Sequence, residues 1–485
     1  MIIKEVSDMA YSCDKVFEFF REICAIPHGT YHIEEISDYL AEFARSRDLR
    51  FIQDELKNVI IFKDATPGYE NEPAVILQGH MDMVAVSDDS NKDMLKEGLD
   101  VAEEGGYLFA KNTSLGGDDG IALAYALTIL DADDIRHPAL EAVFTVNEEV
   151  GMDGALGIDL SKLKAKRLLN IDSEEEGVIT VSCAGGIRLH AELSGETENV
   201  TAPCVFLSLD GLLGGHSGTE IHKMRANGAH LLAEVISEIM DEYDVRLISM
   251  AAGEKDNAIP ASGSAEFLIC DLGDPDEFMQ YVEEIESECI ADYEGIENGI
   301  SITVGIQLPQ ECNCLSEEDS ERFIDYILEV PDGVVKMCND IDMVQTSLNL
   351  GILKCTPGLM SADYAIRSSV SADKKELTEE VAEITEDFEG KWETFGDYPA
   401  WEYVRESPFR EKTIAVYKEL YGGEPVVTGV HAGLECGILA EKIDGLEAVS
   451  IGPNIKEIHT TREKLDIQST IRTWDFILGV LAKKD

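Results

Sequence analysis

The segment PAVILQGHMDMV, residues 73–84, indicates the fold. Its apolar run lacks polar alternation and is followed at once by His80 and Asp82. Such a run is typical of a strand that is buried on both faces of a parallel sheet. Helix-patterned segments flank it, and two more apolar strands follow in ALEAVFTV and RLLNID. Because strands alternate with helices, we predict an α/β domain with a mostly parallel central sheet.

The pattern changes after Ala184-Gly185-Gly186. Residues 187–398 alternate strands such as AEFLI and SITVGIQL with long acidic helices, which predicts an inserted α+β lid domain. This insertion is large enough to hold two similar halves, each the size of a small domain. The α/β pattern then resumes, so residues 1–186 and 399–485 are predicted to form one catalytic domain in two segments.

Composition excludes several classes of protein. The chain has 485 residues, of which 44% are hydrophobic, and no apolar run approaches the roughly 20 residues that cross a bilayer. The start of the chain lacks the basic and apolar regions of a secretory signal, and the eleven scattered cysteines form no paired metal-finger spacing, so we expect a cytoplasmic protein without a membrane partner. A net charge of −57 repels phosphate backbones and argues against nucleic acid as a partner.

Side chains that bind metals follow the ends of several predicted strands. Taken singly, each has a common structural explanation: the aspartates of GGDDG can cap a helix, and adjacent glutamates are usual on an acidic surface. Together they form a mixed nitrogen and oxygen ligand set that suits Zn²⁺, with Mn²⁺ and Co²⁺ as alternatives. Five ligands that share one carboxylate can hold two ions about 3.5–4 Å apart. The candidates are two histidines and a choice among several carboxylates: His80 and Asp82, Asp118 and Asp119, Glu148 and Glu149, Asp172 and His459.

A series of longer motifs resembles a known enzyme family. The motifs are LQGHMDMV, GGDDGIALA, NEEVGMDGA, NIDSEEEG, LLGGHSGTEIH, HAGLECG and IGPNIKEIHTTRE. In this order they are similar to those of the aminoacyl-histidine dipeptidases, also called peptidase D or Xaa-His dipeptidase. These enzymes belong to the di-zinc clan that includes aminoacylase and carboxypeptidase G. The resemblance covers nearly the whole chain and implies metal-dependent hydrolysis of dipeptides.

The resemblance also implies how the ligands are shared between two metal ions. One ion would be held by His80, Asp118 and Asp172, and the other by Asp118, Glu149 and His459. Asp118 would therefore be the bridging ligand and would be followed by a cis peptide bond. Asp119 would be a residue of the helix start, where relatives tolerate a neutral amide.

Catalytic roles follow from the same resemblance. Glu148 would be the general base that takes a proton from a metal-bridging water and passes it to the leaving amine. Asp82 would hold the imidazole of His80, since a ligand histidine needs its second nitrogen fixed. His216, in the insertion, would stabilise the oxyanion, either in its own chain or in the partner of a homodimer.

The remaining candidates would contact the substrate. Arg367 would bind the terminal carboxylate of a short peptide, for which a planar guanidinium is suited. Asn257 would be a polar contact near the scissile bond, and His431 is assigned to the substrate more weakly, as is Glu435 in the same motif. Relatives often carry an arginine where this chain has Ala261, which leaves the preferred side chains open.

Two other functions remain open on the sequence alone. The same metals cleave N-acyl amino acids, so an amidohydrolase is one alternative. A non-catalytic zinc-binding scaffold is the other, but such a protein would be expected to lose the base or a ligand, and this chain retains both.

Overall fold

The computed structural model describes residues 12–485 and divides into two compact units. The first unit contains residues 12–182, 403–429 and 434–485, and the second contains residues 183–402 and 430–433. Residues 1–11, which belong to the segment expected to lack a secretory signal, lie outside the described residues. No helix within residues 12–485 has both the length and the apolar character of a membrane span.

The first unit is built on an eight-stranded sheet. In spatial order its strands are β1 (Arg50–Gln53), β2 (Val59–Lys63), β6 (Leu140–Thr145), β3 (Val75–His80), β7 (Arg167–Asn170), β21 (Glu447–Ser450), β8 (Val178–Cys183) and β20 (Val426–Val430). The four central strands, from β6 to β21, are parallel. The predicted fold class, a mostly parallel α/β sheet, is therefore confirmed.

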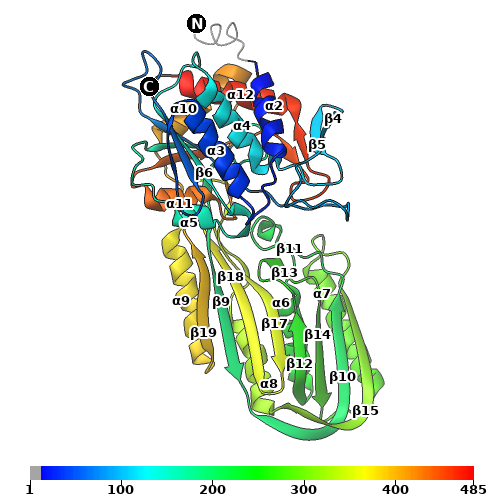
Figure 1. Cartoon of the computed structure of the whole chain (residues 1–485). Helices are drawn as coiled ribbons and strands as arrows, with labels where there is room; N and C mark the ends of the chain where they lie inside the picture. The colour runs from blue at the N-terminus through cyan, green and yellow to red at the C-terminus, as the bar shows by residue number, and fades with distance from the viewer. Residues whose placement is uncertain (1–11) are drawn as a thin grey trace. The chain divides into compact units, whose positions relative to one another are not determined.

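Helices cover this sheet (Figure 1). They are α2 (Asp14–Cys24), α3 (Glu34–Ser46), α4 (Gly117–Asp131), α5 (Asp153–Gly157), α10 (Pro408–Tyr421), α11 (Glu435–Lys442) and α12 (Ile467–Ala482). Every residue of β3, β6 and β7 is buried, so both faces of the sheet are covered. Helix α4 is apolar around its whole circumference because it packs between α2 and β3.

A small four-stranded sheet completes the first unit. Its order is β22 (Ile455–Lys456), β23 (Lys464–Asp466), β5 (Tyr107–Ala110) and β4 (Val101–Glu104). The loop between β22 and β23 contains His459, so this small sheet anchors one of the predicted ligands.

The second unit, which we call the lid, is built on a nine-stranded antiparallel sheet. Its main path is β15 (Ser301–Leu315), β10 (Thr197–Asp210), β14 (Gly263–Ile269), β12 (Val245–Ala252), β17 (Val344–Thr356), β18 (Leu359–Ser368), β9 (Gly185–Ser194) and β19 (Lys391–Tyr398), with β16 (Gly333–Met337) beside β17. A separate hairpin pairs β11 (Gly215–His216) with β13 (Ala258–Ile259). The helices are α6 (Gly228–Glu242), α7 (Pro275–Asp292), α8 (Glu317–Glu329) and α9 (Ser371–Asp387).

The lid sheet consists of two halves with the same connectivity. One half contains β10, β12, β14 and β15, and the other contains β9, β17, β18 and β19. When the strands of each half are numbered along the chain and read from the outer edge of the sheet inward, both halves have the order 4-1-3-2. Each half has one helix before its second strand and one before its fourth. The halves join where β12 pairs with β17. Alternate residues of β9 and β10, such as Leu189 and Leu207, belong to one core that also includes residues of all four helices.

Candidate dinuclear metal site

A glycine-rich turn presents Asp118 at the start of α4. Gly116 is left-handed, with φ of 66°, and Asp118 is non-helical, with φ of −85° and ψ of 106°. The peptide bond between Asp118 and Asp119 is cis, as the resemblance implies. The side chain of Asp119 turns inward and accepts a hydrogen bond from the main-chain amide of His80 at 3.1 Å. A Cβ on Gly79 would lie 2.4 Å from this carboxylate, which explains the glycine beside His80.

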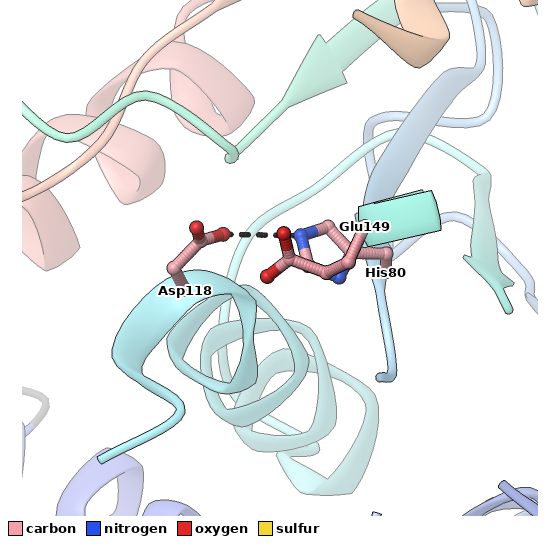
Figure 2. Close-up of side chains that lie close together, drawn as sticks. All are labelled: His80, Asp118 and Glu149. Atoms are coloured by element: carbon pink, nitrogen blue, oxygen red, sulfur yellow. Dashed lines mark hydrogen bonds and ion pairs between the residues drawn. The ribbon is translucent and has the colours of Figure 1, made fainter. Parts of the chain in front are cut away.

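The structure brings all five predicted ligands together in the first unit. Figure 2 shows three of them, with His80 at the end of β3, Asp118 at the start of α4 and Glu149 in a short helical turn. The two carboxylate oxygens of Asp118 point to different histidines. Oδ1 lies 3.0 Å from Nε2 of His80, and Oδ2 lies 3.1 Å from Nε2 of His459.

Each histidine has a second carboxylate beside it. Nε2 of His80 lies 3.5 Å from Oδ1 of Asp172, which follows β7. Nε2 of His459 lies 2.9 Å from Oε2 of Glu149. The five residues thus form two groups of three that share Asp118. Asp119 is also close enough to His80 and Asp172 to make an alternative ligand.

The charges of this cluster are strongly coupled. Burial alone would lower the pKa of His80, but the carboxylates of Asp118, Asp172 and Asp82 raise it well above the usual value. Hydrogen bonds with Asp118 and Glu149 raise the pKa of His459 to about 10. Burial and the neighbouring carboxylates raise the pKa of Asp172 to about 6. The side chains thus hold excess negative charge in a desolvated place.

A divalent cation fits this environment. Within residues 12–485, no lysine or arginine pairs with the carboxylates of Asp118, Glu148, Glu149 or Asp172. Oε1 of Glu149 is buried and has no hydrogen-bond partner. Buried charged carboxylates need a charge partner, hydrogen bonds or a metal ion, and imidazole with carboxylate is a donor set typical of zinc.

Glu148 precedes Glu149 in the turn and is held through Asp82. Oδ1 of Asp82 accepts the main-chain amide of Glu148 at 3.0 Å, and Oδ2 accepts the hydroxyl of Thr30 at 2.9 Å. Nδ1 of His80 lies 3.0 Å from the carbonyl oxygen of Asp82 and 3.7 Å from its carboxylate. Burial raises the pKa of Glu148 well above its usual value, and Asp172 raises it further.

A buried polar network lies among the strand ends of the same unit. Glu435, fully buried at the start of α11, accepts hydrogen bonds from Gln78 at 2.5 Å and Thr145 at 2.6 Å. Gln78 in turn accepts from Asn170 at 2.6 Å. Burial raises the pKa of Glu435 to about 7. The network links β3, β6 and β7, which carry or precede His80, Glu148 and Asp172.

The lid residues His216 and Asn257 lie side by side. His216 pairs with Ala258 across the β11–β13 hairpin, and the main-chain carbonyl of Asn257 accepts from the amide of Ser217 at 2.9 Å. Nδ1 of His216 accepts the main-chain amides of Gly218 and Thr219, both at 3.1 Å. Nε2 therefore carries the proton of the neutral imidazole and is a hydrogen-bond donor.

Arg367 and His431 also belong to the lid unit. Arg367 is 4% exposed, donates to the hydroxyl of Tyr398 at 2.7 Å, and leaves Nε without a partner. Among the described residues no carboxylate forms an ion pair with it. His431 lies 2.7 Å from Ser347, which pairs with Arg367 across β17 and β18. Burial and the nearby Arg367 lower the pKa of His431 to about 3.

Several residues of these clusters were not found from the sequence. They are Gln78 and Thr145 in the first unit and Ser347 and Tyr398 in the lid. Their polar side chains occur in strands whose patterns are otherwise ordinary, so no local signal distinguishes them. Their neighbours across the sheet, which come from distant parts of the chain, give them their roles.

Comparisons with known proteins show the family of this chain. Residues 76–483 match the family model described as peptidase family M20/M25/M40. The cytosol non-specific dipeptidase of Escherichia coli (strain K12) is 32% identical over 471 residues, which are 96% of each chain. The crystal structure of aminoacylhistidine dipeptidase from Vibrio alginolyticus superimposes with a TM-score of 0.91 at 31% identity, covering 97% of this chain and 96% of that one.

A more distant structure shares the fold alone. The aminopeptidase PepT from Bacillus cereus aligns with a TM-score of 0.59 at 16% identity, over 97% of this chain and 98% of that one. The family model and the Escherichia coli relative each cover most of the chain. The chain belongs to peptidase family M20/M25/M40.

Proposed function

We propose that this protein is a metal-dependent dipeptidase that uses Glu148 as its general base. The observation that carries the proposal is the position of Asp118, whose two oxygens face two histidines that each have a second carboxylate beside them. One carboxylate shared in this way can bridge two adjacent cations. The two relatives described above are named as dipeptidases, which supports the same activity for this chain.

The ligand assignment follows from these groups. We propose that His80, Asp118 and Asp172 hold one ion and that Asp118, Glu149 and His459 hold the other. The donors favour Zn²⁺, and Mn²⁺ or Co²⁺ are accepted by the same atoms. When bound, two such ions polarise the scissile carbonyl and increase the acidity of the attacking water.

Glu148 is the proton carrier of the proposed reaction. It belongs to neither ligand group, and its main-chain amide donates a hydrogen bond to the carboxylate of Asp82. As a carboxylate it can take a proton from the attacking water and release it to the leaving amine. The same reasoning makes Asp82 a positioning residue, since it contacts the main chain of Glu148 and the imidazole of His80.

Lid side chains supply the remaining contacts in our proposal. His216, with its Nε2 proton free, donates to the developing oxyanion. Arg367 binds the terminal carboxylate of the substrate, because its buried guanidinium has no anionic partner of its own. Asn257 and His431 are neighbours of these two side chains and complete the polar contacts.

A substrate panel tests this function against the alternatives. The protein loaded with Zn²⁺ is assayed with β-Ala-His, Ala-Gly and N-acetyl amino acids. A dipeptidase cleaves the first two and leaves the N-acetyl compounds intact. Preferential cleavage of the N-acetyl compounds would show an amidohydrolase instead, and no cleavage of any of them would favour a non-catalytic scaffold.

Arg367 gives the first specific prediction. Replacing it with alanine is expected to raise KM for Ala-Gly by about 30- to 5000-fold, because loss of a buried charge partner costs about 2–5 kcal/mol. With Ala-Gly amide, which lacks the carboxylate, the variant and the parent are expected to have similar kcat/KM. Arg322→Ala is the control, because that lid arginine already pairs with Asp319. A similar loss on the amide would contradict the proposed role.

We further propose that His216 serves its own chain, because both halves of the lid sheet are present in one polypeptide. His216→Ala alone is expected to lose activity about 10²- to 10³-fold. Co-expressed with Glu148→Ala, it is expected to regain none. If His216 acted across a homodimer, mixed dimers would have one intact site, and roughly a quarter of the wild-type activity would return. That recovery would contradict the proposal.

Partners and location follow from the same reasoning. We propose that short peptides are the substrates and that the enzyme works in the cytoplasm, since the Escherichia coli relative is named as a cytosolic enzyme. The strongly negative charge, −57, argues against nucleic acid as a partner.

A further inference from the structure

One buried carboxylate holds the loop that carries the proposed bridging ligand. Glu463 is 3% exposed, and its two oxygens accept hydrogen bonds from consecutive main-chain amides. Oε2 accepts from Leu115 at 2.8 Å and from Gly116 at 3.1 Å. Oε1 accepts from Gly117 at 2.7 Å and, more weakly, from Asp118 at 3.5 Å. Consecutive amides that converge on one anion are a recurrent anion-binding arrangement in proteins.

The backbone of residues 115–118 is shaped around this carboxylate. Gly116 adopts φ of 66°, which a glycine allows without strain. A Cβ on Gly117 would lie 3.2 Å from Oε1 of Glu463, closer than an ordinary contact. The two glycines therefore allow the amides to converge. Charged hydrogen bonds of this kind are about twice as strong as neutral ones.

Glu463 also belongs to the segment that carries another proposed ligand. It follows His459 by four residues in the loop between β22 and β23, and its amide bonds to the carbonyl of Thr460 at 3.2 Å. The Glu463 side chain thus fastens the loop of His459 to the loop of Asp118, two segments about 340 residues apart in the chain. Both of its oxygens are occupied by amides, so it is not itself a ligand.

We propose that Glu463 is a positioning residue that sets the distance between Asp118 and His459 and so determines the affinity of the ion that these two residues share. The proposal rests on the proposed function for the identity of the ion site. It concerns metal affinity and loop order, however, and not the reaction that the metals promote.

Glu463→Gln is the variant that tests this. The amide of glutamine has one acceptor oxygen, and its NH2 group would face two of the loop amides, donor against donor. Two buried amides would lose their partner, so the loop should open more often. We expect faster hydrogen exchange at residues 115–117 in the metal-free protein. We expect one of the two Zn²⁺ ions to bind at least about 10-fold more weakly, the effect typical of residues that support a ligand.

The matched control is Glu457→Gln, in the same loop. Glu457 is exposed and pairs with Arg462, and no contact joins its side chain to residues 115–118. Glu457→Gln removes the same charge as Glu463→Gln and is expected to leave Zn²⁺ affinity and amide exchange unaltered. At saturating Zn²⁺, Glu463→Gln is expected to recover most of its kcat with unchanged KM, and Glu463→Asp, which keeps both oxygens, should recover part of the affinity.

The outcomes separate this proposal from the proposed function. Wild-type Zn²⁺ affinity and wild-type exchange in Glu463→Gln would overturn the positioning role even if dipeptides are cleaved. An equal loss of Zn²⁺ affinity in Glu457→Gln would also overturn the positioning role, because the loss would then come from the change in charge alone. Failure of the parent protein to cleave dipeptides would overturn the proposed function and leave the metal-affinity result standing.

Discussion

Replacing Glu148 with alanine is expected to lower kcat for Ala-Gly about 10³- to 10⁴-fold while both metal ions remain bound. The reason is that Glu148 is outside both ligand groups, so its loss removes proton transfer without removing a ligand. Steady-state kinetics on Zn²⁺-loaded protein, with metal content measured by mass spectrometry on the same sample, check both parts of the expectation.

Two further variants show that the effect comes from proton transfer. Glu148→Gln preserves the size of the side chain but cannot accept a proton, so it is expected to be as inactive as the alanine variant. Glu148→Asp keeps the carboxylate on a side chain that is one methylene shorter. Its kcat is expected to fall about 10²-fold, in line with the cost of a roughly 1 Å misplacement. An active glutamine variant would contradict the role of Glu148 as the base.

The second large effect is expected from Asp118→Asn. The asparagine carries no charge and keeps only one of the two oxygens that face His80 and His459, so it can no longer offer a carboxylate oxygen to each of two cations. We expect Zn²⁺ affinity to fall by at least about 100-fold, more than for a residue that only supports a ligand, and activity to be lost at ordinary metal concentration. Competition with a chelator of known affinity measures the change.

Asp119→Asn is the matched control for this prediction. It changes the adjacent aspartate in the same way, but Asp119 accepts the main-chain amide of His80, and an asparagine oxygen can do so too. Burial also raises the pKa of Asp119 well above its usual value, so a neutral side chain suits the position. Two bound ions and activity within a few fold of the wild type are expected. If Asp119→Asn lost metal and Asp118→Asn retained it, Asp119 and not Asp118 would be the bridging ligand.

The parallel sheet could be predicted because its signal is local. Segments such as residues 75–80 are apolar throughout and end in side chains that bind metals, and parallel strands bring such ends together at one edge. His80 and Asp172 are each found in this way, as the residues that end or follow a buried strand. His459 follows a strand at a greater distance, and the motif resemblance was needed to select it.

The supporting residues could not be predicted, because their roles arise only in the folded chain. Glu463 is one of 96 acidic residues, and nothing in its neighbourhood shows that it binds amides of residues 115–118. Glu435 lies in a recognised motif, but its partners Gln78 and Thr145 are far away in sequence. The order of strands in the lid is hidden for a similar reason, since one half of that sheet is inserted after the first strand of the other.

We infer that five side chains of the first unit hold two metal ions through one shared carboxylate. Anomalous diffraction from crystals of the Zn²⁺-loaded protein tests it most directly. We predict two peaks about 3.5–4 Å apart, one beside His80 and Asp172 and one beside Glu149 and His459, with Asp118 in contact with both. A single peak, or a pair of peaks that Asp118 does not bridge, would contradict the account.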